Sequence, residues 1–115
     1  MKSKAVRVHV AGGPHVLSIE TVDVPAPGPG EVLVRHTAIG VNLIDIYHRS
    51  STAGQYAIPR PATLGVEAAG VVEAVGADVG GLVPGQRVAY WNVLGAYAER
   101  RIVPAWRLVP IPDAV

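Results

Sequence analysis

Hydrophobic and polar residues alternate at the start of the chain, where Val6, Val8 and Val10 are interleaved with Arg7 and His9. A period of two is typical of a β-strand with one buried side and one side in water. The pattern therefore predicts a first strand whose buried side carries the three valines.

Extended segments and turns continue through the first third of the chain. A glycine and proline turn at 12–14 precedes a second extended stretch at 16–24. Alternating proline and glycine in PAPGPG, residues 25–30, exclude both a helix and a central strand there. The pattern of EVLVRHTAI, residues 31–39, predicts a further strand, which Gly40 ends.

One segment has helical rather than extended spacing. In NLIDIYHRS the apolar residues Leu43, Ile44 and Tyr47 recur at intervals that place them on one helix face, and Asn42 suits the N-cap. A helix this short needs tertiary contacts to persist. We therefore expect one or two turns of helix beginning after Asn42.

The remaining residues read as a loop followed by several short strands. The loop spans 51–63, and strands are expected at 66–76, 86–91, 96–103 and 106–109. Gly70 lies inside the first of these and predicts a bulge or a close backbone approach. Six or seven short strands with one or two short helices predict a mainly β, partly open β-barrel forming a single domain over 1–115.

Composition narrows the classes of protein that this chain fits. Half of its 115 residues are hydrophobic and 17% are charged, which favours a folded core. A net charge of +1 is too small for a nucleic-acid partner. No apolar run approaches the length of a membrane span, and the amino terminus lacks a signal-peptide core. With no cysteine present, we expect a cytoplasmic protein without disulfides or thiolate metal ligands.

The chemistry-bearing residues are scattered and indicate no metal or nucleophile site by themselves. The histidines at 9, 15, 36 and 48 lack metal-ligand spacing, which favours surface or packing roles. Arg100 and Arg101 are expected to form a solvated strand end. Asp45 and Glu67 are expected to be hydrogen-bond partners rather than catalytic bases, because no second carboxylate or histidine stands at a matching position.

A set of motifs in fixed order carries a family resemblance. The motifs are GGPHVL, PGPGEVLVR, AIGVNLIDIYHRS, LGVEAAGVVEAVG, PGQRVAY and LGAYAER. Together they resemble the GroES-like catalytic domain of medium-chain dehydrogenases and reductases, in the zinc-free quinone oxidoreductase branch. The resemblance implies a GroES-like barrel that lacks the Rossmann nucleotide-binding domain of the full-length family, so that 1–115 form an incomplete substrate-side domain.

The resemblance also bears on metal binding. Zinc-dependent alcohol dehydrogenases of this superfamily have cysteine and histidine where this chain has Asn42 and Val66. Neither residue is a good zinc ligand, and Glu67 alone is too little, since a catalytic zinc needs about three protein ligands. We therefore expect no zinc.

The resemblance implies that Asn42, Tyr47 and Tyr56 line the cleft where nicotinamide and acceptor carbonyl meet, with Asn42 and Tyr47 also contacting the cofactor. Asp45 and Glu67 would lie behind them. Amide and phenol groups suit this role because both can hydrogen-bond an oxygen that gains negative charge. Each residue has a plainer explanation: Asn42 as a helix cap, Tyr47 as core packing and Tyr56 as a surface anchor.

The implied activity is hydride transfer from NADPH to a quinone or similar conjugated carbonyl, by a homo-oligomeric full-length enzyme. The 115-residue chain alone is expected to be inactive, because the helix that binds the dinucleotide pyrophosphate is missing from it. Two alternatives stay open. The chain could belong to an enoyl reductase of the same superfamily, or act alone as a non-catalytic GroES-like binding or assembly module.

Overall fold

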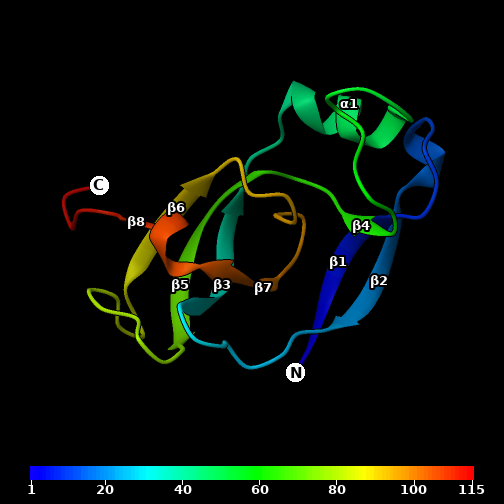
Figure 1. Cartoon of the computed structure of the whole chain (residues 1–115). Coiled ribbons are helices and arrows are strands. Elements are labelled where there is room, and N and C mark those ends of the chain that lie inside the picture. The colour runs from blue at the N-terminus through cyan, green and yellow to red at the C-terminus, as the bar shows by residue number, and fades with distance from the viewer.

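Two antiparallel sheets make up most of the molecule, whose computed structural model describes residues 1–115. They contain the strands β1 (Lys2–Val8), β2 (Ser18–Asp23), β3 (Glu31–Ile39), β4 (Ala62–Thr63), β5 (Glu67–Val75), β6 (Arg87–Trp91), β7 (Arg100–Pro104) and β8 (Val109–Pro110). One sheet has the order β2-β1-β4 and the other β7-β3-β5-β6-β8. Figure 1 shows the sheets side by side, with the carboxyl end extending beyond β8.

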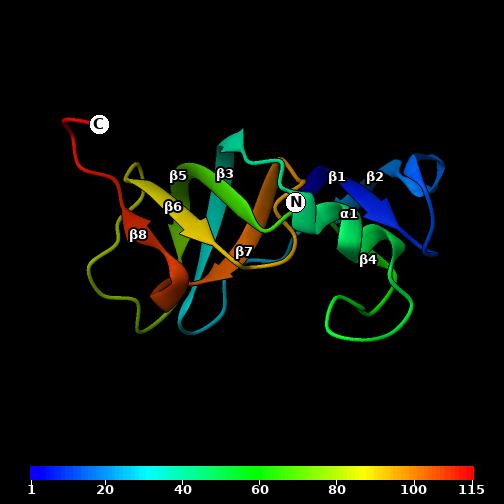
Figure 2. The same ribbon diagram turned by 90° about the horizontal axis from the view of Figure 1, so that it is seen from above.

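The helix α1 (Leu43–Ser50) lies over one end of the three-stranded sheet, as Figures 1 and 2 agree. Two single 3₁₀ turns, η1 (Pro14–Val16) and η2 (Ala105–Arg107), complete the regular structure. No helix of the chain is long and apolar enough to cross a lipid bilayer. The two sheets meet without closing into a barrel, joined by an isolated bridge between Ala5 and Ala98. The predicted mainly β, partly open barrel is thus confirmed.

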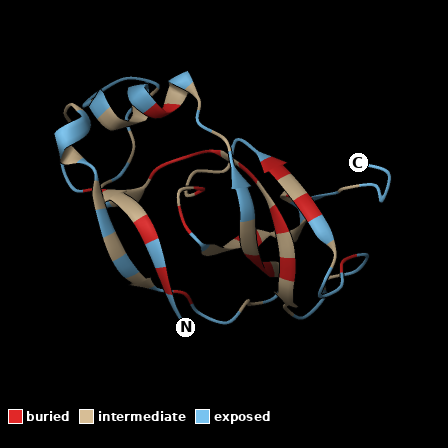
Figure 3. Ribbon diagram, turned by 180° about the vertical axis from the view of Figure 1, so that it is seen from behind, coloured by how far each residue is buried: buried red, intermediate tan, exposed pale blue.

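The hydrophobic core belongs to the five-stranded sheet. Figure 3 shows buried positions recurring along its strands. The core cluster consists of Val32, Val34, Ala68, Val72, Leu82, Val88, Tyr90, Ala96, Val103 and Leu108. Most members are β-branched or small, which suits closely packed pleated strands. This sheet therefore carries the main packed core, and the connecting segments extend from it.

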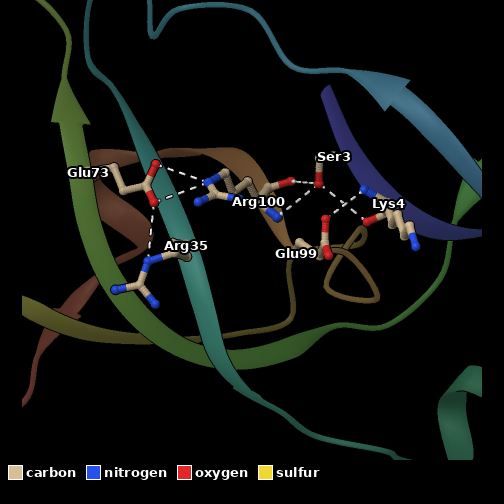
Figure 4. A network of polar contacts seen from close by, with 6 residues as sticks. All are labelled: Ser3, Lys4, Arg35, Glu73, Glu99 and Arg100. Carbon is tan, nitrogen blue, oxygen red and sulfur yellow. Dashed lines mark hydrogen bonds and ion pairs between the residues drawn. The ribbon is translucent and has the colours of Figure 1, made fainter. Parts of the chain in front are cut away.

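A polar network joins the two sheets at their shared border (Figure 4). Glu73 of β5 accepts hydrogen bonds from Arg100 Nε at 3.1 Å and forms an ion pair with Arg35 at 3.2 Å. The main-chain nitrogen of Arg100 donates to Ser3 Oγ at 3.1 Å, and Lys4 N donates to Glu99. The prediction of a solvated arginine pair was wrong for Arg100, because Glu73 of β5 supplies a carboxylate partner for its side chain.

Four predicted segments differ from the structure, one of them the strand predicted at 96–103, which begins only at Arg100 as β7. The buried side of β1 carries Ser3, Ala5 and Val8, whereas Val6 is half-buried and Val10 is 62% exposed. The strand begins four residues before the valines, and it ends at Val8, so Val10 lies outside it. The extended stretch predicted at 16–24 begins as η1, where the chain reverses between the antiparallel strands β1 and β2, and the one predicted at 106–109 begins as η2, which connects β7 to β8.

Candidate functional site

The start of α1 is built around a buried carboxylate. Asp45 is 4% exposed, and its Oδ2 accepts the main-chain N–H of Asn42 at 3.0 Å. The N–H of Asp45 donates back to the Asn42 carbonyl at 3.0 Å. An acidic residue at the third helical position commonly accepts the N–H of the residue before the helix in this way. The expected helix is therefore confirmed, and Asn42 stands directly before its first residue.

A tyrosine from a distant segment reaches the same carboxylate. The hydroxyl of Tyr97, in the connection between β6 and β7, donates to Asp45 Oδ2 at 2.5 Å. Burial, followed by the Asp45 carboxylate, raises the pKa of Tyr97 well above its ordinary value. The hydroxyl therefore stays protonated at neutral pH and remains a hydrogen-bond donor.

The side chain of Asn42 points to the neighbouring sheet. Its Nδ2 donates to Glu67 Oε1 at 3.2 Å, at the first residue of β5. Glu67 in turn packs against Gly40, where an added Cβ atom would overlap its carboxylate oxygen. The predicted residues Asn42, Asp45 and Glu67 thus lie in one connected hydrogen-bonded group, which Tyr97 completes.

The two predicted tyrosines form a separate aromatic pair. The ring centroids of Tyr47 and Tyr56 are 5.0 Å apart with planes tilted by 43°, and the His48 ring lies 6.5 Å from Tyr56. Tyr47 is 39% exposed, and Leu43 is 63% exposed. Leu43 and Tyr47 are therefore exposed, which disagrees with the plainer explanation of Tyr47 as core packing, and the buried residue of α1 is Asp45.

Polar contacts instead hold the carboxyl end of α1. One guanidinium nitrogen of Arg60 lies 3.0, 3.4 and 2.8 Å from the carbonyl oxygens of His48, Arg49 and Ser51. Arg49 Nε also donates to the Gly12 carbonyl at 3.0 Å. These carbonyls are the ones a helix end leaves without partners. Arg60 therefore ties the loop that carries Tyr56 to the helix that carries Tyr47.

Replacing Arg60 by methionine is expected to loosen this loop. The substitution keeps an unbranched side chain but removes the donor, which should cost about 1–2 kcal/mol. Urea denaturation checks the stability, and limited proteolysis checks the accessibility of residues 51–59. Arg87→Met is the matched control, because Arg87 donates to carbonyls of the exposed carboxyl-terminal residues. Equal protease sensitivity of the two variants would contradict the role of Arg60 in holding this loop against the end of α1.

Two grooves meet at Tyr97. The groove of about 420 Å³ beside the helix start is lined in part by Asn42, Asp45, Arg49 and Tyr97. A larger one, about 590 Å³, runs between β1 and β3 and is lined mainly by apolar side chains together with His36 and Tyr97. Neither contains the Tyr47 and Tyr56 pair. Sequence reasoning missed Tyr97, whose only signal was its place in the motif LGAYAER.

Comparison with known proteins identifies the fold family. The family described as Alcohol dehydrogenase GroES-like domain matches residues 28–113. The chain belongs to this family. The quinone oxidoreductase of Pseudomonas aeruginosa is 44% identical to this GroES-like domain over 98% of the chain and 34% of the relative. A 2-haloacrylate reductase of a Burkholderia species is 43% identical over 94% of the chain and 33% of the relative.

Solved structures agree with these sequence matches. The quinone oxidoreductase of Pseudomonas syringae pv. tomato superposes with a TM-score of 0.90 at 45% identity, covering 98% of this domain and 34% of that chain. The Escherichia coli quinone oxidoreductase complexed with NADPH gives a TM-score of 0.90 at 35% identity, covering 97% and 34%. The resemblance to quinone oxidoreductases is confirmed, and this GroES-like domain spans about a third of the length of these relatives.

The donor set in this domain does not fit a catalytic zinc ion. Val66 is 1% exposed and offers no ligand, and Glu67 is bonded to the Asn42 amide. No group of three histidine, cysteine, aspartate or glutamate side chains lies close enough to hold a metal. An amide nitrogen and one carboxylate are too few and too weak as ligands for a site of this kind. The residues around Asn42 and Val66 therefore do not form a zinc site.

Proposed function

We propose that this GroES-like domain is the substrate-side part of a zinc-independent oxidoreductase that passes hydride from NADPH to a quinone or similar conjugated carbonyl. The observation that carries the proposal is the Asn42 amide, held by Glu67 at the start of α1 beside a groove. The likeness to quinone oxidoreductases, one of them complexed with NADPH, supports the reaction and the cofactor.

The chemistry of the donor set fits the nicotinamide end of that cofactor. An amide both donates and accepts hydrogen bonds, and a phenol donates to an oxygen that gains charge, so Asn42 and Tyr47 suit a carboxamide and an acceptor oxygen. NADPH supplies the hydride when bound. Tyr56, whose ring packs at a tilt against Tyr47, would add an aromatic wall for a flat acceptor. Asp45 and Glu67 hold Asn42 rather than touching the reactants.

The pyrophosphate of the dinucleotide finds no corresponding site in this domain. Residues 1–115 contain a single α-helix and no parallel strand–helix–strand unit, which is the structure that binds a dinucleotide phosphate. We therefore infer that the 115-residue chain by itself does not oxidise NADPH. The proposal also includes a homo-oligomeric enzyme in the cytoplasm, where a chain without cysteine is suited to a reducing environment.

A second acceptor class is favoured by one specific relative. The 2-haloacrylate reductase is as similar to this domain as the quinone oxidoreductases are. Its name indicates a carbon–carbon double bond conjugated with a carboxylate, and a quinone ring and an enoyl thioester likewise have a double bond conjugated with a carbonyl group. Initial rates with benzoquinones, 2-haloacrylates and enoyl thioesters separate these acceptor classes.

Substitutions at Asn42 and Tyr47 test the assigned site. In the enzyme that contains this domain, Asn42→Ala and Tyr47→Phe should each lower kcat/KM for the quinone by about tenfold, because each removes a group that orients the reactants. Gln55→Ala, on the exposed part of the loop, is the matched control. Unchanged kinetics in both variants would rule out this site, and NADPH oxidation that is independent of every acceptor tested would rule out the reaction.

A further inference from the structure

The carboxylate of Asp45 joins two segments that are 52 residues apart in the sequence. Its Oδ2 accepts one hydrogen bond from the main chain of Asn42 and one from the hydroxyl of Tyr97. Its other oxygen, Oδ1, is buried and has no partner. A buried carboxylate with two hydrogen bonds depends on both of them, because losing either leaves a largely desolvated polar group with too few partners.

We infer that Tyr97 is a positioning residue for Asn42, acting through Asp45: its hydroxyl fixes the carboxylate that fixes the start of α1. Its effect on turnover rests on the proposed function, whereas its effect on the geometry of Asn42 does not.

Tyr97 is held in place by contacts of its own main chain and ring, so its hydroxyl can fix the position of the Asp45 carboxylate. Its main-chain N–H donates to Leu64 O and its carbonyl accepts the N–H of Val6, both at 2.8 Å. The ring lies directly over Gly65, where an added Cβ atom would overlap it and where φ is +88°. The three-stranded sheet and the segment before β5 therefore place the hydroxyl independently of α1.

The helix, in contrast, has little other support at its beginning. Leu43 and Ile46 are 63% and 44% exposed, and Asp45 is the one buried residue of α1. Burying few apolar atoms, an eight-residue helix depends on polar contacts for its position. Without the Tyr97 hydroxyl, the first turn should move or fray, and the Asn42 amide should lose its fixed orientation toward Glu67.

Amide hydrogen exchange and NMR of the 115-residue chain test the geometry directly. In Tyr97→Phe, the main-chain N–H of Asn42 should exchange about tenfold faster, and the side-chain amide resonances of Asn42 should shift. Tyr90→Phe is the matched control, since the Tyr90 hydroxyl bonds His36 and Arg101 rather than α1. The inference is overturned if Asn42 is unchanged in Tyr97→Phe, or if the control alters it equally.

A second variant covers a failure of Tyr97→Phe to fold. Asp45→Asn keeps the side-chain size but replaces the charged acceptor, and it should give the same change at Asn42. In the enzyme that contains this domain, Tyr97→Phe should lower kcat several-fold at unchanged KM, with no added loss when combined with Asn42→Ala. If the two losses in kcat added fully, Tyr97 would not act on turnover through Asn42. If Asn42→Ala leaves turnover unchanged, the proposed site fails, whereas the role of Tyr97 in the geometry is still decided by the exchange rates.

Discussion

Gly70→Ala should destabilise the chain by about 3 kcal/mol, the upper part of the usual range for forcing extra atoms into a packed interior. Gly70 pairs with His36 across β3 and β5, and a Cβ atom there would overlap the carbonyl oxygen of Arg35. A main-chain oxygen in the centre of a sheet cannot rotate away. The strands must therefore separate locally, which should shift the urea midpoint downward at an unchanged slope.

Gly80→Ala provides the matched control for that substitution. Nothing lies within 4 Å of a Cβ atom at Gly80, and its backbone is outside the left-handed region. Its free energy of unfolding should stay within about 0.5 kcal/mol of the original chain, as for most surface substitutions. Equal midpoints for the Gly70 and Gly80 variants would show that β3 and β5 adjust without loss, contrary to the close approach of their backbones.

Local patterns predicted this fold well where the chain itself sets the structure. The proline and glycine run at 25–30 and the glycine at 40 bound β3, and Gly70 marks a close approach beside a shift of register between His36 and Ala38. Such residues act through their own backbone, so one sequence suffices to read them. The buried side of β1 was not predictable in the same way, because alternation indicates two faces without showing which the rest of the molecule covers.

The site shows the same division between local and distant information. The helix start after Asn42 follows from neighbouring residues, whereas the contact between Tyr97 and Asp45 depends on how the connection between β6 and β7 is placed against α1. Arg60 is another example, because a lone arginine in a proline-rich loop gives no sign of the helix end that it contacts. Residues that position others from a distance leave no spacing pattern along the chain.

His36→Leu should lower the free energy of unfolding by about 2–3 kcal/mol at pH 7.5. Each buried polar group left without its hydrogen-bond partner costs roughly 1–3 kcal/mol. His36 Nδ1 lies 2.7 Å from the Ala98 carbonyl oxygen, to which it can only donate, so Nε2 accepts the Tyr90 hydroxyl at 2.9 Å. The Tyr90 oxygen in turn accepts from Arg101 at 3.3 Å. This relay joins β3, β6 and β7, and it corrects the expectation of a solvated Arg101. His15→Leu, at an exposed histidine, is the control and should leave stability unchanged.

The cost of His36→Leu should also shrink as the pH falls. Burial, and secondarily the Arg101 charge, lowers the pKa of His36 in the folded chain, while the unfolded chain keeps an ordinary value near 6.5. The unfolded state therefore binds the proton first. The contribution of His36 to stability is complete above pH 6.5 and is lost progressively as the pH falls through that value toward the lowered pKa. A protonated ring would also place a donor against the Tyr90 hydroxyl and a charge near Arg101. Urea midpoints of the original chain and of His36→Leu, measured between pH 7.5 and 5, should converge toward low pH; a constant difference would mean that His36 has the same pKa in the folded and the unfolded chain.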